Sequence, residues 1–363
     1  MSASLGLVGL PNAGKSTLFN ALTAGHAAVA PYPFTTIDQH AGVAPVADAR
    51  LDALAALLAP ERIIPTSLEV VDIAGLVKGA HQGEGLGNQF LSHIAGVDAL
   101  LHVVRCFEDA NVAHPMGGVE PLRDVEVVNA ELMLKDLEVV ERRREKERKL
   151  AKGGDKQAAA FVEQLARWHA ALAAGTPVRS LGLAPEAHPK RFGVELLSAK
   201  PVLYAANVGE DAQAAAGAVA QVRALAEREG ARVVVCCAKL EAELAELEPA
   251  DRRAMMQEWG MHESALPAVI REGYALLHLV TFFTTASKIL QAWTVSHGTK
   301  APQAAGVIHT DFERQFIRAE VIPTQTLLRC GSEANARVQG LLRLEGKAYA
   351  VQDGDVIHFR VSP

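Results

Sequence analysis

The spacing of glycine, lysine and serine near the start of the chain is suited to holding phosphates. Residues 9–16 read Gly-Leu-Pro-Asn-Ala-Gly-Lys-Ser and fit the pattern G-x-x-x-x-G-K-S. The glycines let the loop curl so that backbone N–H groups point at phosphate oxygens. Lys15 would reach the β- and γ-phosphates, and the Ser16 hydroxyl would ligate Mg²⁺. The residues expected at the phosphates are Asn12, Ala13, Gly14, Lys15, Ser16 and Thr17.

Two elements must hold this loop in position. The uncharged run at residues 5–8 is typical of a buried strand. Residues 16–22 continue as a helix whose N-terminus faces the phosphates. A strand before the loop and a helix after it distinguish a phosphate-binding loop from a chance match to the pattern.

A second group of metal-binding and phosphate-sensing residues follows another predicted strand. The apolar run at 67–73 leads into the sequence Asp-Ile-Ala-Gly. We expect Asp72 to hold the metal through water and the Gly75 N–H to sense the γ-phosphate. In the loop between the two elements a threonine would complete the Mg²⁺ shell, and Thr36 is favoured over Thr35.

The group that orients the attacking water is not evident from this pattern. Leu76 stands where many GTPases place a glutamine for that purpose, and a leucine side chain neither donates nor accepts a hydrogen bond. The glycine-rich stretch 79–88 has few conformational restraints. It could bring His81 or Gln82 to the phosphate, or rearrange on hydrolysis.

The residues after two later strands bear on the choice of base. A GTPase carries Asn-Lys-x-Asp at this point, and its aspartate accepts two hydrogen bonds from guanine. This chain reads Asn-Val-Gly-Glu at 207–210. Loss of the paired acceptor removes discrimination against adenine, and an asparagine amide can pair with the N6/N7 edge of adenine. The residues expected around the base are Asn207, Val208, Glu210, Ala238 and Lys239.

The order of apolar runs predicts a parallel sheet that is interrupted by an insertion. Strand-like runs at 99–105, 201–207 and 232–237 alternate with helical patterns, as in a sheet covered by helices on both faces. Helical patterns at 130–152 and 156–174, joined by a glycine turn, predict a hairpin. An α+β module follows, with a helical pattern at 304–314 and a strand at 356–361. The predicted domains are 1–128 with 201–277, an inserted arm at 129–200, and a C-terminal domain at 278–363.

Charge and cysteine content limit the class of protein. Net charge is −6 overall, but 129–200 carries +4 and 278–363 carries +2. These basic segments fit RNA contact and equally an ordinary solvated surface. The four cysteines show no metal-binding spacing, which favours reduced thiols in the cytoplasm. No signal peptide or membrane span is expected, because the chain enters a strand at once and lacks a long apolar stretch.

Over essentially its whole length the chain resembles the YchF/Obg-like ATPases of the P-loop GTPase class. The segments that carry the resemblance are 9–17, 72–80, 83–91, 102–107, 207–210, 238–244, 301–306, 308–313, 318–322 and 344–347. The resemblance implies an α/β P-loop fold with a helical arm and a C-terminal TGS domain of ubiquitin-like β-grasp shape. It also implies an ATPase that uses Mg²⁺ and acts with ribosomes and ribosomal RNA in translation or stress responses.

The resemblance also assigns roles to individual residues. It makes His114 the group that positions the attacking water, and it makes Asn12 similar to the K⁺-coordinating asparagine of cation-dependent relatives. We expect a monomer that binds neither DNA nor membranes. Two alternatives stay open: a GTPase of ribosome assembly or translation, and an RNA- or ribosome-binding module that uses nucleotide only as a structural ligand.

Overall fold

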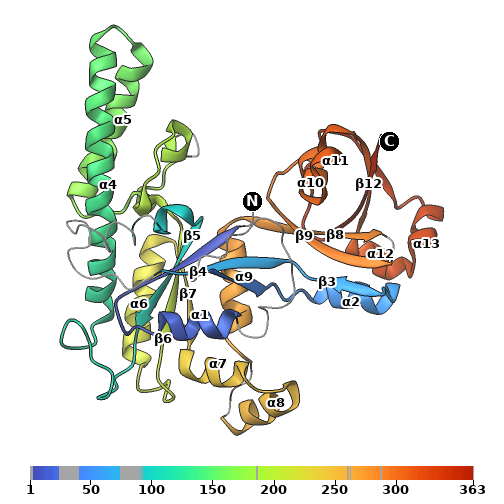
Figure 1. The fold of residues 1–363 in the computed structure, drawn as a ribbon, viewed down its shortest axis with the longest axis horizontal. Coiled ribbons are helices and arrows are strands. Elements are labelled where there is room, and N and C mark those ends of the chain that lie inside the picture. The colour runs from blue at the N-terminus through green and yellow to red at the C-terminus, as the bar shows by residue number, and fades with distance from the viewer. Residues whose placement is uncertain are drawn as a thin grey trace. The chain divides into compact units, whose positions relative to one another are not determined.

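The computed structural model describes residues 3–23, 41–73, 91, 93–184, 187–259, 261, 263–286 and 288–362. The described chain divides into two compact units (Figure 1). Residues 3–43 and 69–273 belong to one, and residues 44–68 and 274–363 to the other. Predicted site residues Thr36 and Gly75, together with Leu76, His81 and Gln82, lie outside the described residues.

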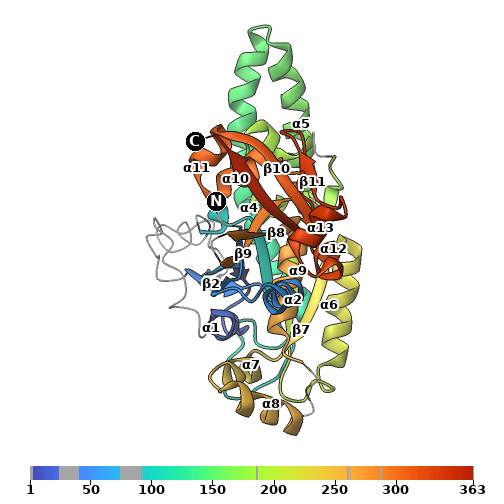
Figure 2. The same cartoon turned by 90° about the vertical axis from the view of Figure 1, so that its right-hand side faces the viewer.

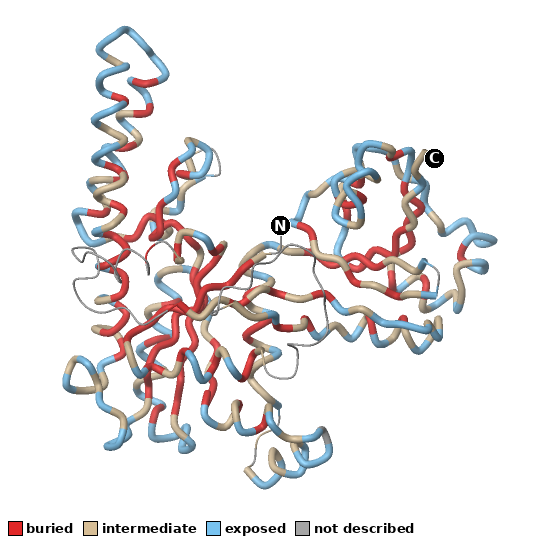
Figure 3. The backbone as a smooth tube through the Cα atoms, viewed as in Figure 1, coloured by how far each residue is buried: buried red, intermediate tan, exposed pale blue. Residues whose placement is uncertain are grey.

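A six-stranded sheet forms the centre of the first unit. Its order is β2 (Ala41–Pro45), β4 (Ser67–Asp72), β1 (Ser4–Val8), β5 (Ala99–Arg105), β6 (Val202–Asn207) and β7 (Arg232–Cys236). Strands β4, β1, β5, β6 and β7 pair in parallel. Strands β1, β5 and β6 are buried along their whole length, which explains why their sequences are continuous apolar runs (Figure 3).

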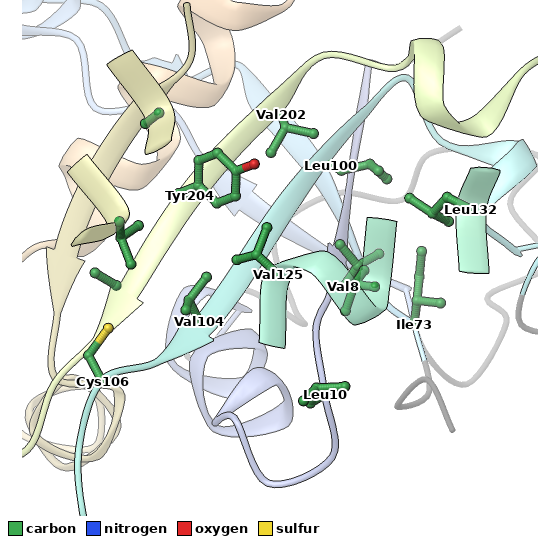
Figure 4. Packing of buried hydrophobic residues seen from close by; sticks show 14 of the residues in the cluster. Val8, Leu10, Ile73, Leu100, Val104, Cys106, Val125, Leu132, Val202 and Tyr204 are labelled. Atoms are coloured by element: carbon green, nitrogen blue, oxygen red, sulfur yellow. The ribbon is translucent and has the colours of Figure 1, made fainter. Parts of the chain in front are cut away.

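The first unit also contains helices, some of which pack against the sheet while others pack on neighbouring helices. They are α1 (Lys15–Thr23), α4 (Pro121–Lys152), α5 (Lys156–Ala173), α6 (Ala216–Glu229), α7 (Ala238–Ala245), α8 (Pro249–Glu258) and α9 (Leu266–Leu276). Short 3₁₀ turns follow α5 at Val178–Leu181, Pro189–Phe192 and Leu197–Ala199. Val125 and Leu132 of α4 pack in one cluster with Val8, Leu100 and Val104 of the sheet (Figure 4).

The predicted helical hairpin is present, and its first helix is longer than expected. Helix α4 begins at Pro121, not near residue 130, because proline is favoured in the first turn and Asp124 adds a favourable negative charge there. Asp155 ends the glycine turn and caps α5 by accepting from the N–H groups of Gln157 and Ala158. The core of the hairpin is formed by the apolar stripe of α5, namely Phe161, Leu165, Trp168 and Leu172.

The second unit is built on a mixed sheet. Its order is β11 (Arg343–Glu345), β10 (Phe316–Pro323), β12 (Asp355–Val361), β8 (Leu279–Ala286), β9 (Ile289–Ser296) and β3 (Arg62–Ile64). Strands β12 and β8 run parallel, and β10–β12 and β8–β9 are antiparallel pairs. This arrangement of two antiparallel pairs joined by a parallel central pair is that of a β-grasp sheet.

Helices cover both faces of this second sheet. They are α10 (Ala301–Ile308) and α11 (Thr310–Arg314) on one side, and α2 (Ala49–Leu58), α12 (Thr324–Cys330) and α13 (Glu333–Val338) on the other. The single helical segment expected near 304–314 is two helices. His309 separates them because its backbone is extended and its ring accepts from the Asp311 N–H to cap the second one.

Residues 44–68 group with the C-terminal residues, whereas the sequence placed them in the nucleotide-binding domain. Strand β3 pairs in parallel with β9, and Leu51 and Leu54 of α2 lie in one core with Phe283. The Arg50 guanidinium binds the Asp353 carboxylate at 2.6 Å. This segment therefore belongs to the compact unit of the C-terminal residues, although the chain enters it from the first sheet.

Candidate nucleotide-binding site

The loop between β1 and α1 has the backbone that a phosphate cradle requires. Gly14 has φ +96°, and a Cβ there would collide with the Asn207 amide. Gly9 has φ +149°, and a Cβ there would meet the Val103 carbonyl. Asn12 takes the left-handed conformation at φ 62°. Both glycines are thus required by close approach of neighbouring strands as well as by their own torsions.

Lys15 begins α1 and lies buried beneath the loop. Its Nζ donates to the Leu10 carbonyl at 2.9 Å. Burial lowers the pKa of Lys15 to about 8, and the negative charge of Asp72 partly opposes this shift. A buried ammonium with one carbonyl acceptor has unused donors and too little negative charge near it. Phosphate oxygens in the cradle would supply both.

The residues present fit a Mg²⁺ ion. Asp72 lies at the end of β4, and its Oδ1 is buried without a hydrogen-bond partner among the described residues. Such an oxygen is the ligand type that Mg²⁺ or its bound water prefers. Ser16, in the first turn of α1, is exposed. The described part of the chain holds no group of three or more His, Cys, Asp or Glu side chains that could hold a metal ion.

Asn207 connects the two nucleotide-binding loops. Its side-chain Nδ2 donates to the Ala13 carbonyl at 2.9 Å, and its Oδ1 accepts from the Ala238 N–H at 2.9 Å. The residue is 3% exposed. In this arrangement the amide fixes the phosphate loop against the start of α7. The expected pairing of this amide with an adenine edge is not what the geometry favours, because both of its ends are already bonded to the protein.

Glu210 and Lys239, both expected around the base, form an ion pair with each other. The Lys239 Nζ lies 2.6 Å from the Glu210 Oε1, and both side chains are exposed. Hydrogen bonding to Glu210 raises the pKa of Lys239. Val208 is buried below them, and α7 begins at Ala238. The carboxylate that would have to read guanine is therefore paired with a lysine from the neighbouring loop.

His114 lies in a loop between β5 and α4. Its Nε2 is 2.9 Å from the Asp124 Oδ2, and its Nδ1 accepts from the Met116 N–H at 3.1 Å. The His114 and Asp124 side chains are only 7% and 6% exposed. Both ring nitrogens are thus occupied, and neither is free to bind a water in this arrangement.

Arg105, whose role sequence reasoning missed, and Asn12, which was expected at the phosphates and as a K⁺ ligand, hold the His114 loop beside the phosphate loop. Arg105 is buried and donates to the carbonyls of Phe107 and Val112 at 3.1 and 3.0 Å. The Asn12 Nδ2 donates to the Ala113 carbonyl at 3.0 Å. These contacts are made to backbone oxygens, so no residue type or spacing in the sequence reveals them.

The chain is similar to known protein families and to individual proteins over nearly its whole length. Two family models match, one described as a 50S ribosome-binding GTPase over residues 4–147 and one described as a protein of unknown function, YchF-GTPase_C, over residues 279–362. The protein of Bacillus subtilis (strain 168) called ribosome-binding ATPase YchF is 49% identical over 363 residues, covering 99% of each chain. The chain belongs to the YchF family. A ribosome-binding ATPase YchF of Haemophilus influenzae is 49% identical over 360 residues, with 99% of each covered.

A solved structure supports the same assignment to YchF. The structure described as the Schizosaccharomyces pombe YchF GTPase has a TM-score of 0.88 and 34% identity, covering 99% of this chain and 98% of that one. The expected resemblance to YchF and the expected P-loop fold with a C-terminal TGS-like domain are confirmed. Among the described residues, no helix combines the length and apolar character needed to cross a membrane.

Proposed function

We propose that this YchF-family chain is an ATPase that associates with ribosomes. The observation that carries the hydrolase assignment is the buried Lys15 beneath the curled loop, together with the unpartnered Asp72 oxygen. The names of the relatives support both the ATPase and the ribosome. The chemistry is an in-line attack of water on the γ-phosphate.

Each residue of the phosphate site has a defined task in this proposal. Backbone N–H groups from Asn12 to Thr17 orient the phosphates, and Lys15 neutralises charge that develops on the β- and γ-oxygens. Ser16, Asp72 and Thr36 would hold Mg²⁺, which supplies further charge neutralisation when bound. We assign the γ-phosphate contact to the Gly75 N–H.

His114 is our candidate for positioning the attacking water, because Leu76 cannot do so. The ring must first leave Asp124 or Met116, since both nitrogens are bonded to them. Asp124 belongs to α4, the helix that continues into the arm. Release of His114 would therefore be coupled to movement at the base of that helix.

Adenine is favoured over guanine by the pair of Glu210 and Lys239. Guanine recognition in a GTPase needs a free carboxylate that accepts two hydrogen bonds, and Glu210 already accepts from Lys239. An exposed ion pair is weak, at about 0–1 kcal/mol, so GTP remains the alternative substrate. Asn12 as a K⁺ ligand also remains part of the proposal, to be tested by replacing K⁺ with Na⁺.

The proposed partners are the ribosome and its RNA, and the proposed location is the cytoplasm. The basic residues of the 129–200 arm support this assignment, as does the exposed tip of its hairpin (Figure 3). We propose that the chain works as a monomer with no DNA or membrane partner. An RNA-binding module with nucleotide as a structural ligand is the second candidate, favoured by the present bonding of His114 away from a substrate water.

The test compares ATP hydrolysis and ATP affinity in three variants. His114→Ala is expected to lower kcat by about 10²-fold or more and to leave affinity unchanged, as for loss of a general acid–base group. Lys15→Ala is expected to abolish binding. Asp124→Asn is expected to raise basal hydrolysis, because a neutral amide holds the ring less tightly than a carboxylate does.

Each result for the three variants has a different interpretation. Full hydrolysis by Lys15→Ala would overturn the ATPase assignment. Unchanged kcat in His114→Ala would remove His114 from the mechanism while leaving the ATPase intact. A fall in kcat for Asp124→Asn would show that Asp124 orients the ring for catalysis instead of restraining it.

A further inference from the structure

One part of the second unit's sheet lacks a covering helix. On β10 the alternation of side chains places Arg318, Glu320 and Ile322 on the same face. Ile322 is buried in a core with Leu327 of α12 and Ala336 of α13. Arg318, farther along the strand, is half exposed. The cover provided by α12 and α13 therefore ends between these two positions. Figure 2 shows both helices near one end of the sheet.

Three arginines converge on Glu320, near the point on β10 where α12 and α13 no longer cover the sheet. Arg360 of β12 donates from Nε to the Glu320 Oε1 and from Nη2 to the Glu320 Oε2, both at 3.1 Å. Arg337 of α13 donates from Nη2 to the Glu320 Oε2 at 3.0 Å. Arg318 approaches to 3.9 Å. The Glu320 side chain is 5% exposed, whereas those of the arginines are 53–62% exposed.

The buried Glu320 carboxylate holds the guanidinium groups in place without using all of their N–H donors. Hydrogen bonds and charge from Arg360, with the charge of Arg337, lower the pKa of Glu320. The Glu333 carboxylate also interacts with Arg337 and Arg360, so two negative charges face three positive charges. Arg337 uses one of its five N–H donors on Glu320 and Arg360 uses two. The remaining donors point from half-exposed side chains that are already ordered, which lowers the entropy lost on binding an anion.

Exposed aliphatic side chains lie next to the arginines. Leu344 of β11 is directly opposite Glu320 in the strand register and is 62% exposed. Val338, at the end of α13, is 89% exposed. Strongly exposed aliphatic groups beside fixed guanidinium forks form a surface that is suited to a partner with both anionic and apolar parts.

We propose that this surface, made of Arg318, Arg337, Arg360 and Leu344 and called here the arginine face, binds the phosphodiester backbone of single-stranded RNA. Arginine forks match phosphate oxygens in geometry and charge, and the three arginines outnumber the carboxylates of Glu320 and Glu333, which favours an anionic partner. Leu344 would contact the ribose or base. The inference rests on the ribosome association proposed above and gives that association a definite contact in the C-terminal domain.

The test uses the full chain and a fluorescently labelled oligouridylate longer than roughly 16 nucleotides. Affinity is measured by fluorescence anisotropy over a series of salt concentrations. The variants are R318Q, R337Q and the double variant, all of which keep the two hydrogen bonds from Arg360 to Glu320. K288Q is the matched control, because Lys288 lies in the same unit and its exposed side chain pairs, among the described residues, with the exposed Glu61.

The double variant is expected to bind RNA about tenfold more weakly at low salt. The slope of log affinity against log salt should fall by about 1.4, as for two lost phosphate contacts on a single strand. K288Q should bind normally, and ATP affinity should be unchanged in every variant. Thermal unfolding confirms that each variant is folded.

Three outcomes would overturn the inference. Unchanged RNA affinity and salt slope in the folded double variant would exclude the arginine face as an RNA site. Weaker binding to whole ribosomes with unchanged RNA binding would identify an acidic protein surface as the partner. An equal loss in K288Q would show unspecific attraction by net charge. None of these results bears on nucleotide hydrolysis, which the Lys15 and His114 variants test separately.

Discussion

At the scale of single residues, the protonation of Lys15 governs the nucleotide site. The pKa of this ammonium is lowered to about 8 by burial, so the proton is partly lost just above neutral pH in the nucleotide-free protein. A bound triphosphate would restore the charged form, because phosphate oxygens surround the ammonium. Binding must then take up a proton at pH values above about 8.

We therefore predict that ATP affinity declines as pH rises above about 8, approaching tenfold per pH unit, and that Lys15 causes no change below that value. Titration calorimetry in two buffers of different ionisation enthalpy should detect uptake of up to one proton near pH 9. Circular dichroism at the same pH shows whether the protein is still folded. An affinity that is constant between about pH 8 and about pH 9, with no proton uptake, would contradict this account of Lys15.

Residue types and spacing predicted the phosphate loop but not the bonding of the side chains around it. Gly14, Lys15 and Asp72 could be assigned because their chemistry requires those types at those positions. The role of Asn207 could not, because its partners Ala13 and Ala238 are backbone groups brought together only by the fold. The predicted contacts of Thr36 and Gly75 lie outside the described residues and stay predictions.

At the scale of elements, α4 serves two structures. Its first turns pack Val125 and Leu132 on the central sheet, and its later turns form the hairpin core with α5 (Figure 4). Asp124 lies in the first part, bonded to His114. One continuous helix therefore links the arm to the residue proposed to position water.

The hairpin depends on Trp168, and we predict that Trp168→Ala lowers the local free energy of unfolding by about 3–5 kcal/mol. Trp168 is fully buried, with ring centroids 5.8 Å from Phe192 and 6.2 Å from Phe161. Hydrogen exchange over α5 measures the effect. Arg167→Ala, at the exposed neighbouring position, should change the value by no more than about 0.5 kcal/mol. A Trp168→Ala variant with unaltered exchange would show that the hairpin does not rely on this core.

The positions of the helices and strands along the chain were largely predictable from the sequence. Their first and last residues were less predictable. Buried parallel strands such as β5 and β6 appear as continuous apolar runs, so they were found at once. The start of α4 was missed although Val125, Val128 and Leu132 have helical spacing and are buried together, because the first turns of the helix carry few charges compared with the arm. The split at His309 was missed because it depends on one extended backbone torsion.

At the scale of the whole molecule, family resemblance predicted the fold better than local pattern did. Local patterns in the TGS-like domain do not show how its strands pair, and its β-grasp sheet becomes evident only from the pairing of β12 with β8. The grouping of residues 44–68 with the C-terminal unit could not be predicted, because strand β3 has only three residues and pairs with a strand more than 200 positions away.

The central claim is that a GTPase-like fold selects ATP because Lys239 occupies the carboxylate of Glu210. The most direct test is equilibrium binding of ATP and GTP, each with Mg²⁺, to the protein freed of nucleotide, with Lys239→Ala beside the unaltered chain. We predict that the unaltered chain binds ATP more tightly than GTP and that Lys239→Ala narrows the difference by releasing Glu210. Tighter binding of GTP by the unaltered chain would contradict the account and identify a GTPase whose glutamate reads guanine.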